Sequence, residues 1–509
     1  MKKSFHNLLN QLGVEIPPSL NNPDIYNLTF DSRDVKQGDL FIGLPGAKVD
    51  GGIFCLHAIR KGAVASIIGS SAAKLITPMA ENILVVDEIE ELAGALASIF
   101  WGNPSSKMSL IGITGTNGKT TIAHLVEHLS TSTGIPSALF GTLGNRWPGH
   151  SERSSFTTCF ADKLQNKLSE AIKAGVELGV MEVSSHSLAQ KRVYGCHFSG
   201  AIFTNLTQDH LDYHLTMESY FKVKSSLFSS PFIAKSSRNI VVNVDDFWGK
   251  RLAKTLEGRC WRSSILLEDS NPEGYELTIQ VINKSPLGIK ALINTPRGRG
   301  SFISPLLGNF NLMNILQAIG ILLQHGYSLN DLLDVINDFP GVPGRMEVIK
   351  PIKTLESIQY PLVIVDYAHT PDGLEKALIS IKDFAESNII CVFGCGGDRD
   401  RDKRSKMGSI ASKYADCIIL TSDNPRTEDS SQIFADIMFG IPSNINASLE
   451  PDRSLAISKA ISQAKTEDII LIAGKGHEDY QIIGDRKIYF DDRIQAKREL
   501  LKRIELDKK

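Results

Sequence analysis

The stretch Gly112–Thr121 reads Gly-Ile-Thr-Gly-Thr-Asn-Gly-Lys-Thr-Thr and stands between a short apolar run and a stretch with helical spacing. In a loop of this kind, successive backbone N–H groups face phosphate oxygens, and the following helix adds the positive end of its dipole. Lys119 supplies a positive charge, and Thr120 offers its hydroxyl to Mg²⁺. The stretch therefore predicts a phosphate-binding loop for ATP or GTP, in a variant form, because Ile113 stands where the common pattern has glycine. The alternative is a glycine-rich turn that binds no ligand.

With 509 residues, the chain exceeds what one hydrophobic core normally organises, so we expect several domains. A formal net charge of −2 argues against a nucleic-acid partner, which normally leaves a basic patch. The seven cysteines lack paired metal-binding spacing, which favours reduced thiols in the cytoplasm. No apolar run approaches the roughly twenty residues of a membrane helix, and no signal peptide is recognisable. We expect a soluble cytoplasmic protein without membrane insertion.

The pattern of apolar and polar residues divides the chain into three expected domains, residues 1–107, 108–342 and 343–509. Turn-rich residues 101–106 and Pro- and Gly-rich residues 339–345 are the expected linkers. Alternating strand-like and helix-like runs predict an α/β fold throughout: an N-terminal α/β domain, a central P-loop ATPase-like domain with a mostly parallel sheet, and a Rossmann-like C-terminal domain. Residues 276–302 are expected to form antiparallel strands of a subsidiary sheet. The other predicted strands are residues 39–44, 65–69, 82–86, 108–114, 178–183, 200–204, 239–244, 362–365, 389–393, 417–421 and 469–473.

Each of the last four predicted strands ends in a polar or glycine-rich loop. In open α/β sheets, ligands bind outside the carboxyl ends of the strands, so these loops are expected to meet on one rim. The alternative for any one of them is a solvated turn. The loops begin with Asp366-Tyr-Ala-His-Thr-Pro-Asp, Gly394-Cys-Gly-Gly-Asp-Arg-Asp, Asp423-Asn-Pro-Arg and Gly474-Lys-Gly-His-Glu-Asp.

Two stretches of the central segment carry candidate metal ligands. Glu182 ends a buried strand, where a carboxylate oxygen suits a hard cation such as Mg²⁺, and the alternative is a capping or surface carboxylate. Asp209, His210 and Asp212 crowd one turn after the next strand. His210 could ligate a metal, contact a phosphate or satisfy a buried hydrogen bond, and the residues alone leave these open.

Four motifs in this order resemble those of the Mur ligase family of ATP-dependent peptidoglycan ligases. The resemblance extends from Asp31-Ser-Arg to Gly474-Lys-Gly-His-Glu-Asp-Tyr and so covers nearly the whole chain. The motifs are Gly115-Thr-Asn-Gly-Lys-Thr-Thr, Glu182-Val-Ser-Ser-His, Thr204-Asn-Leu-Thr-Gln-Asp-His-Leu-Asp-Tyr-His and Asp366-Tyr-Ala-His-Thr-Pro.

The resemblance implies two binding regions for a UDP-muramoyl-dipeptide. The N-terminal domain would hold the UDP moiety, although Asp50-Gly-Gly stands where many relatives carry histidine or arginine after Asp-Gly. The residues implied for the nucleotide are Phe30, Ser32, Ala47, Lys48 and Val49. Those implied for the muramoyl-dipeptide are Thr157, Thr158, Ser184, Gln190 and Arg192.

The resemblance also implies an ATP site with two Mg²⁺ ions. Lys224 matches the family's carbamylated lysine, N6-carboxylysine, whose two oxygens make a hard ligand; without the resemblance it would be read as a solvated lysine on a helix. The implied metal ligands are Thr120, Glu182, His210 and the Lys224 carbamate, and the implied catalytic residues are Lys119, Glu182, His210 and Lys224. The implied ATP-binding residues are Gly115, Thr116, Asn117, Gly118, Lys119, Thr120, Thr121, Asn309, Asp366 and His369.

The C-terminal segment is expected to select the amino acid that is added. Diaminopimelate differs from lysine by one extra carboxylate, which a guanidinium pairs through two parallel hydrogen bonds. Arg426 is the group that diaminopimelate-adding members place there, whereas lysine-adding relatives generally lack it. Glu478 suits the distal ammonium. The implied diaminopimelate-binding residues are Arg399, Asp423, Asn424, Pro425, Arg426, Gly474 and Glu478.

The resemblance therefore implies ATP-dependent addition of meso-diaminopimelate to the D-glutamyl γ-carboxylate of UDP-N-acetylmuramoyl-L-alanyl-D-glutamate through an acyl phosphate. The expected partners are these small molecules, and the expected state is a monomer that closes its lobes on the substrates. The alternatives are a lysine-adding relative, a ligase similar to folylpolyglutamate synthases, and a nucleotide-binding scaffold without activity.

Overall fold

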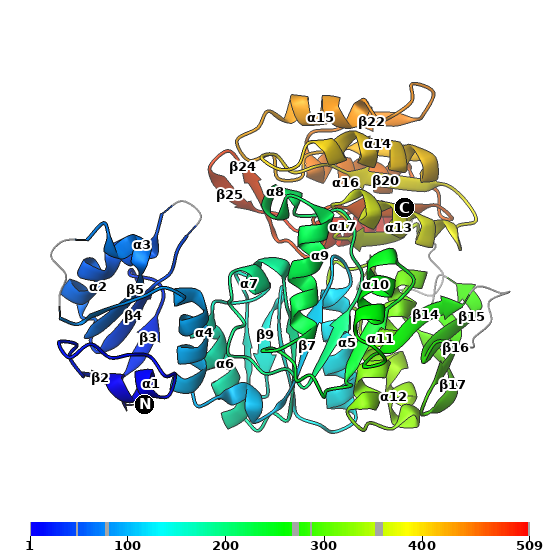
Figure 1. The fold of residues 1–509 in the computed structure, drawn as a ribbon. Helices are drawn as coiled ribbons and strands as arrows, with labels where there is room; N and C mark the ends of the chain where they lie inside the picture. The colour runs from blue at the N-terminus through cyan, green and yellow to red at the C-terminus, as the bar shows by residue number, and fades with distance from the viewer. Residues whose placement is uncertain are drawn as a thin grey trace.

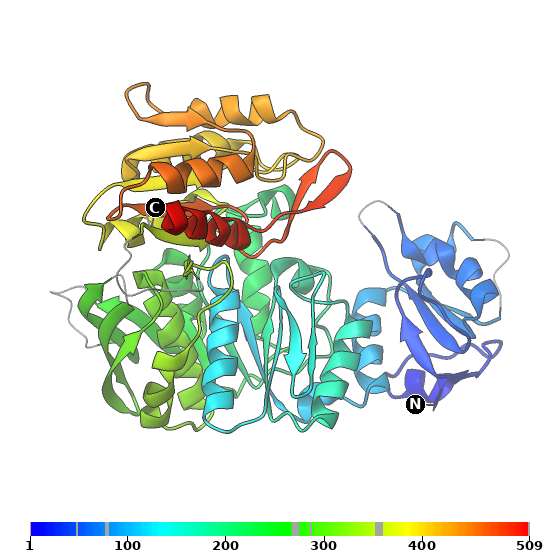
Figure 2. The ribbon, with the colours of Figure 1, turned by 180° about the vertical axis from the view of Figure 1, so that it is seen from behind.

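The computed structural model describes residues 2–46, 49–76, 81–266, 274–285, 288–351 and 360–506. Three α/β bodies follow one another along the chain (Figure 1). The N-terminal body lies beside the central one, and the C-terminal body lies over the central one, as the view from behind also shows (Figure 2). No helix in the described ranges is long and apolar enough to span a bilayer. All seven cysteines are free thiols.

The N-terminal body is built on a four-stranded parallel sheet of order β3-β4-β5-β6. Its strands are β3 (Asn27–Thr29), β4 (Asp39–Gly43), β5 (Ala65–Gly69) and β6 (Ile83–Val86), and a two-stranded ladder joins β1 (Lys3–Ser4) to β2 (Asp24–Ile25). Its helices are α1 (Phe5–Asn10), α2 (Cys55–Lys61), α3 (Ser70–Ala73) and α4 (Ile89–Phe100). Helix α4 packs against helix α6 (Ala161–Lys173) of the central body, which fixes how the two bodies meet.

The central body holds an eleven-stranded sheet of order β10-β9-β8-β11-β7-β12-β13-β14-β15-β16-β17. Strands β8, β11, β7, β12, β13, β14 and β15 are parallel, as expected for strands that alternate with helices. The strands are β7 (Ser109–Thr114), β8 (Ser137–Gly141), β9 (Gly144–Trp147), β10 (His150–Glu152), β11 (Leu178–Glu182), β12 (Gly200–Phe203), β13 (Ile240–Asn243), β14 (Trp261–Leu266), β15 (Leu277–Ser285), β16 (Gly288–Thr295) and β17 (Gly298–Ser304).

The prediction of a subsidiary antiparallel sheet is wrong in one respect. Strands β15, β16 and β17 do pair antiparallel with one another. However, β15 also pairs in parallel with β14, because β14 otherwise leaves an unpaired edge of backbone donors and acceptors. The three strands therefore extend the main sheet.

Helices cover both faces of the central sheet. On one face, α5 (Lys119–Ser132), α11 (Asn309–Gln324) and α12 (Leu329–Val335) share a buried apolar cluster with the strands. On the other, α6 packs with α9 (Met217–Ser225) and α10 (Phe247–Thr255) over a second cluster. Two short helices, α7 (Ser185–Ala189) and α8 (Leu211–His214), follow the strands that carry the site.

The C-terminal body is a six-stranded sheet of order β18-β19-β23-β20-β21-β22. Strands β19, β23, β20 and β21 are parallel neighbours, so the four polar loops that follow them meet on one rim, as the sequence predicts. The strands are β18 (Glu347–Val348), β19 (Leu362–Asp366), β20 (Ile389–Phe393), β21 (Cys417–Leu420), β22 (Ala447–Leu449) and β23 (Ile469–Ala473). The helices are α13 (Pro371–Lys382), α14 (Asp402–Tyr414), α15 (Ser430–Met438), α16 (Arg453–Gln463) and α17 (Asp492–Leu506), and a hairpin joins β24 (Tyr480–Ile483) to β25 (Arg486–Tyr489).

Candidate active site

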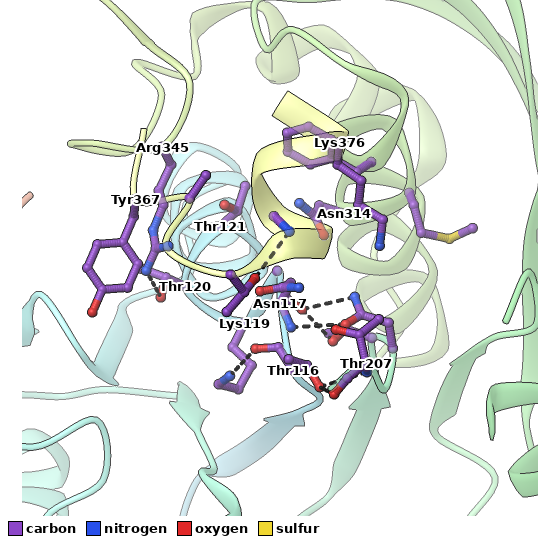
Figure 3. A pocket seen from close by; sticks show the side chains of 18 of the residues that line it. Thr116, Asn117, Lys119, Thr120, Thr121, Thr207, Asn314, Arg345, Tyr367 and Lys376 are labelled. Carbon is purple, nitrogen blue, oxygen red and sulfur yellow. Dashed lines mark hydrogen bonds between the residues drawn. The ribbon is translucent and has the colours of Figure 1, made fainter. Parts of the chain in front are cut away.

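A cavity of about 570 Å³ lies where the C-terminal body meets the central one. The phosphate loop and the start of α5 form one wall, and residues of the C-terminal body, among them Arg345, Tyr367 and Lys376, form another (Figure 3). Thr116–Thr121, Asn309, Asp366 and His369 all line this cavity. Of the ten residues predicted to bind ATP, the structure therefore brings nine together around one cavity, with Gly115 directly beside Thr116.

The glycines of the phosphate loop are required by its shape. Gly115 has φ +147° and Gly118 has φ +89°, in the region that favours glycine. A Cβ at Gly115 would lie 1.9 Å from Thr204 Oγ1, and one at Gly118 would lie 2.6 Å from Asn314 Oδ1. The backbone N–H of Asn117 donates to Asn205 Oδ1 at 2.9 Å, which fixes the loop from the neighbouring strand end.

Lys119 folds back over the loop. Its Nζ donates to Gly115 O at 3.0 Å and to Thr116 O at 2.8 Å. Burial lowers the pKa of Lys119, while the Glu182 and Asp209 carboxylates oppose that shift. A phosphate placed in the loop offers the ammonium a stronger, charge-assisted partner than these carbonyls.

Glu182 is a fully buried carboxylate that is held by neutral donors. Its Oε2 accepts from Thr120 Oγ1 at 2.8 Å, and its Oε1 accepts from the Thr142 backbone N–H at 2.8 Å. Within the described ranges, no basic side chain forms a salt bridge with it. A buried carboxylate beside a hydroxyl, without a cationic partner, has the oxygen donors that Mg²⁺ takes, so these residues fit the metal.

Lys224 is buried and its Nζ donates to Gly115 O at 2.7 Å. Burial, reinforced by the nearby Lys119 charge, lowers the pKa of Lys224 well below its ordinary value. A lysine in such a place is readily deprotonated, which is the form that reacts with CO₂.

His210 begins α8 in a left-handed conformation, with φ +53°. Its Nε2 lies 3.3 Å from the Asp209 carboxylate, and partial desolvation outweighs that carboxylate and lowers the pKa of His210. The imidazole is therefore neutral near pH 7, as a metal ligand must be.

The four predicted metal ligands are not all in contact. Thr120 bonds directly to Glu182, but among the described residues neither His210 nor Lys224 hydrogen-bonds to that pair. The described part of the chain also holds no group of three His, Cys, Asp or Glu side chains that converge as ligands. A second metal site at these positions would depend on the carbamate oxygens of Lys224.

Contacts between the two bodies bring in residues that the sequence did not single out. Asn117 Nδ2 donates to Asp372 Oδ2 at 3.0 Å, and Asp372 also pairs with Lys376 at 2.9 Å. Arg345 Nη2 lies 3.5 Å from Thr120 Oγ1, and its guanidinium stacks 4.3 Å from the Tyr367 ring centroid. Arg345 closes the Pro- and Gly-rich linker, and a cation in that position is the one signal that could have suggested it.

Three other predicted ATP-binding residues differ in what they do. Asn309 begins α11, and its buried Oδ1 has no hydrogen-bond partner among the described residues, so it is free to meet a ligand. Burial lowers the pKa of His369, which keeps its ring neutral. Asp366 accepts from the backbone N–H groups of Met346 at 2.7 Å and Ala368 at 2.8 Å, so its carboxylate joins its own loop to the residues that follow the linker.

The five residues predicted for the dipeptide form one group beside Glu182. Arg192 stacks 4.1 Å from the Phe160 ring centroid and donates to Thr158 O at 3.1 Å and to Gln190. Thr158 Oγ1 donates to Glu182 O at 2.8 Å, while Ser184 caps α7 and Thr157 lines the cavity.

The residues predicted for the UDP moiety are only partly described. Phe30, two residues before Ser32, donates its backbone N–H to Asp162 of the central body at 3.2 Å. The Arg33 guanidinium holds the pKa of Asp31 down at about 2 and so stiffens this turn. Val49 is half-exposed, whereas Ala47 and Lys48 lie outside the described residues.

On the rim of the C-terminal sheet, Glu478 meets a buried lysine that the sequence did not single out. Lys475 Nζ lies 3.1 Å from Glu478 Oε2 and 3.3 Å from Asn424 Oδ1, and Asn424 Nδ2 donates to Glu478 Oε2 at 2.9 Å. Lys475 belongs to the same polar loop as Glu478, and its place in that loop is the signal that could have suggested it. Gly474, with φ +113°, passes close to the Asp423 carboxylate, so the two loops pack tightly.

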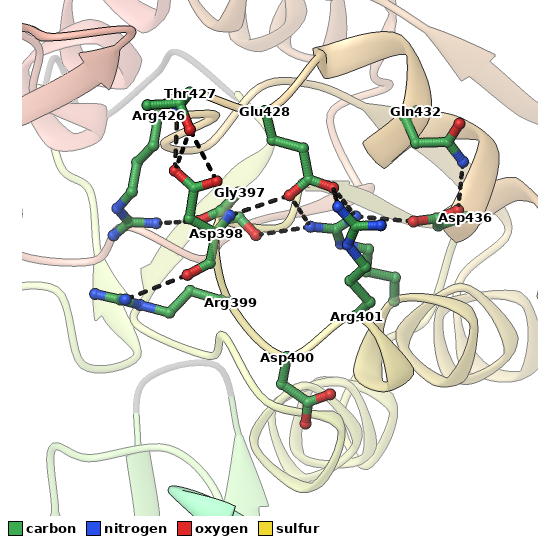
Figure 4. A network of polar contacts seen from close by, with 12 residues as sticks. Gly397, Asp398, Arg399, Asp400, Arg401, Arg426, Thr427, Glu428, Gln432 and Asp436 are labelled. Carbon is green, nitrogen blue, oxygen red and sulfur yellow. Dashed lines mark hydrogen bonds and ion pairs between the residues drawn. The ribbon is translucent and has the colours of Figure 1, made fainter. Parts of the chain in front are cut away.

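The two predicted diaminopimelate-binding arginines lie on neighbouring loops (Figure 4). Arg426 follows Pro425 in a left-handed conformation, with φ +53°, and its Nη1 donates to Gly397 O at 2.8 Å. Arg399 Nη1 donates to Asp398 O at 3.3 Å. Both guanidiniums retain further N–H groups that could receive a carboxylate.

Comparisons with known proteins cover the same three bodies. The Mur ligase family, catalytic domain, matches residues 24–101; the Mur ligase middle domain matches residues 113–322; the Mur ligase, glutamate ligase domain, matches residues 344–476.

Several curated relatives carry the name UDP-N-acetylmuramoyl-L-alanyl-D-glutamate--2,6-diaminopimelate ligase. One from Prochlorococcus marinus (strain NATL2A) is 54% identical over 98% of this chain and 99% of its own. One from Nostoc sp. (strain PCC 7120) is 46% identical over 96% of this chain and 97% of its own. A solved structure with the same name is 33% identical, with a TM-score of 0.69 over 99% of both chains. This chain therefore belongs to the Mur ligase family.

Proposed function

We propose that this chain is an ATP-dependent ligase that joins meso-2,6-diaminopimelate to the D-glutamyl γ-carboxylate of UDP-N-acetylmuramoyl-L-alanyl-D-glutamate, in peptidoglycan precursor synthesis. The observation that carries this proposal is the full-length identity of 54% to a relative named for that ligation. The cavity between the phosphate loop and the C-terminal body supports it. An ATP-dependent ligation needs the nucleotide and the incoming amino acid close together, and this cavity is lined by both bodies.

Residues 1–107 would hold the UDP moiety, 108–342 the ATP and the dipeptide, and 343–509 the amino acid. In the first step, a γ-carboxylate oxygen attacks the terminal phosphorus of ATP, and the bond to ADP breaks to give an acyl phosphate. In the second, the amine nitrogen attacks the acyl carbon, phosphate leaves, and the amine loses a proton. The protein contributes chiefly position and charge. Lys119 and the loop N–H groups would hold the phosphates, while Arg192 and Ser184 would orient the dipeptide.

Glu182 and Thr120 would hold one Mg²⁺, and His210 with a carbamate on Lys224 would help to hold a second. When bound, the ions would offset the repulsion between the carboxylate and the phosphates. The buried Glu182, which has no salt bridge among the described residues, and the depressed pKa of Lys224 support this arrangement. Carbamylation adds CO₂ to the neutral Nζ and releases one proton, which replaces a neutral amine by an anion in the site.

Arg426 and Arg399 would bind the second carboxylate of diaminopimelate, and Glu478 its distal ammonium. A lysine-adding ligase is the main alternative, because lysine lacks only that carboxylate. Arg426 disfavours it, since a guanidinium repels an ammonium placed nearby.

The test is ADP formation by the purified chain with ATP, Mg²⁺ and the UDP-muramoyl-dipeptide, comparing meso-diaminopimelate, L-lysine and L-glutamate. We expect turnover with diaminopimelate and at least about tenfold lower kcat/KM with lysine, as one lost charge-assisted pair implies. Omission of the dipeptide is the control for idle ATP hydrolysis. Equal rates with lysine would overturn the specificity, and nucleotide binding without turnover would favour the scaffold. The predicted monomeric state stays a prediction that light scattering can check.

A further inference from the structure

Several hydrogen bonds join two neighbouring loops of the C-terminal body, among them the Gly397 N–H to Asn424 O at 2.9 Å and one that Glu428 accepts (Figure 4). One loop follows β20 and carries Arg399, and the other follows β21 and carries Arg426. They approach so closely that a Cβ at Gly397 would lie 1.9 Å from Pro425 O. The separation of the two arginines is therefore set by what joins the loops.

Glu428, on the loop that follows β21, is held by Arg404 and also bonds to the loop that follows β20. Arg404, with a side chain 0% exposed, donates to Glu428 Oε1 at 2.8 Å and to Oε2 at 2.7 Å, in a bidentate pair. Glu428 Oε2 also accepts the backbone N–H of Asp398 at 3.0 Å. Arg404 itself donates to Gly396 O at 3.3 Å, so the pair touches both loops.

A second contact joins the same two loops. The Asp398 carboxylate accepts from the Thr427 N–H at 3.1 Å and from Thr427 Oγ1 at 3.0 Å. Asp398 has φ +54° and Arg426 has φ +53°, left-handed conformations that are unfavourable for residues with a side chain. Such backbone is kept only where the surroundings hold it, and here the bonds across the two loops do so.

We propose that Glu428, anchored on Arg404, is a positioning residue that fixes the spacing of Arg399 and Arg426 and thereby selects an amino acid with a second carboxylate. This inference rests on the proposed function. Glu428 touches neither substrate nor cofactor in it; it acts through the loops. A bidentate site tolerates little misplacement, because a shift of about 1 Å can reduce activity many-fold.

Asp436 offers a matched control on the same guanidinium. Its carboxylate accepts from Arg404 Nη1 at 2.8 Å, but its other partner is Gln432 on α15, away from both loops. Asp436→Asn removes one of the two negative charges that pair with the buried Arg404, as Glu428→Gln removes the other. It leaves the bonds between the two loops in place. Thr427→Val is a milder second probe, because Thr427 is exposed and its loss removes only the hydroxyl bonds to Asp398.

The experiment measures kcat and KM for each substrate in the full-length wild type and the three variants, with melting temperatures alongside. For Glu428→Gln we expect an increase of about tenfold in the KM for meso-diaminopimelate and a reduced preference for it over L-lysine. The KM for ATP and for the UDP-muramoyl-dipeptide should stay within about twofold. Thr427→Val should raise the KM for diaminopimelate and reduce the preference for it in the same way, but to a smaller extent. Asp436→Asn should lower the melting temperature without changing that KM or that preference.

Equal changes in Glu428→Gln and Asp436→Asn would overturn the inference and assign Glu428 a purely structural role. An unchanged KM for diaminopimelate in both Glu428→Gln and Thr427→Val would overturn it too. If Glu428→Gln does not fold, the KM values for diaminopimelate of Thr427→Val and Asp436→Asn are compared instead. Equal KM values in these two variants would overturn the inference. A wild type that turns over no diaminopimelate would refute the proposed function itself, which keeps the two failures distinct.

Discussion

Replacing Lys224 by arginine tests whether this position acts as a carbamate or as a cation. Lys224 is 1% exposed, its one hydrogen bond goes to Gly115 O at 2.7 Å, and no carboxylate in the described ranges forms a salt bridge with it. Arginine keeps a positive charge, but it cannot be deprotonated in a protein and so cannot take up CO₂. We expect Lys224→Arg to lose the anionic oxygens from the site.

The size of the effect follows from the burial of the group. A preorganised charged group in a water-excluded site typically contributes about 10²–10³-fold in kcat, which is about 3–4 kcal/mol. The assay is phosphate release at saturating substrates, with bicarbonate removed or added. For the wild type, activity should fall as bicarbonate is depleted and recover when it returns.

Lys224→Arg should be insensitive to bicarbonate. Retention of more than about a tenth of wild-type kcat by this variant would refute the reasoning, since the group would then serve as a cation. Mass spectrometry under mild conditions provides an independent check for the added CO₂ on the wild-type lysine.

Three further changes have defined outcomes. Arg426→Leu should raise the KM for diaminopimelate by about 10–100-fold without a similar loss for L-lysine, as one charge-assisted pair of about 1.5–3 kcal/mol predicts, and steady-state kinetics with both amino acids would show it. Arg453→Met should destabilise the C-terminal body by about 3–5 kcal/mol, because Asp492, 0% exposed, would lose its 2.7 Å partner and stay buried with its charge; calorimetry should then show a lower-melting transition. Glu428, whose pKa the Arg404 guanidinium holds at about 2 against an ordinary 4.5, contributes stability that is complete above pH 4.5 and is lost as pH falls toward 2. Acid unfolding of Glu428→Gln should therefore depend less steeply on pH in that window, and an unchanged slope would contradict this assignment.

The sequence predicted the parallel strands well because buried parallel strands are nearly continuous apolar runs. Residues 65–69, 389–393 and 469–473 agree with β5, β20 and β23 to the residue. Strand β8 escaped notice, since Ser-Ala-Leu-Phe-Gly has little strand propensity and owes its place to the sheet on both sides. The edge pairing of β15 with β14 also has no local signature, because it depends on which edge is left open.

The phosphate loop and Glu182 could be found from local pattern, as their chemistry lies in contiguous residues. The bond from Asn117 to Asp372 joins residues 255 positions apart, and the stacking of Arg345 on Tyr367 joins two loops. Neither contact has a signal in spacing, and only the cation that ends the Pro- and Gly-rich linker hints at Arg345. The buried Lys475 shows a limit in charge: the sequence places it in a polar loop on the rim, but only the fold shows that it lies among Asp423, Asn424 and Glu478.

The bond between Asn117 and Asp372 makes the cavity the joint property of two separately packed bodies. Ligand occupancy and interbody orientation are then thermodynamically linked, and the linkage is reciprocal. A cross-link that clamps the interface shut should tighten nucleotide affinity by the same factor by which nucleotide favours the shut arrangement. The affinity of a compound that contacts both walls of the cavity would then depend on the relative orientation of the two bodies as much as on its contacts with either wall.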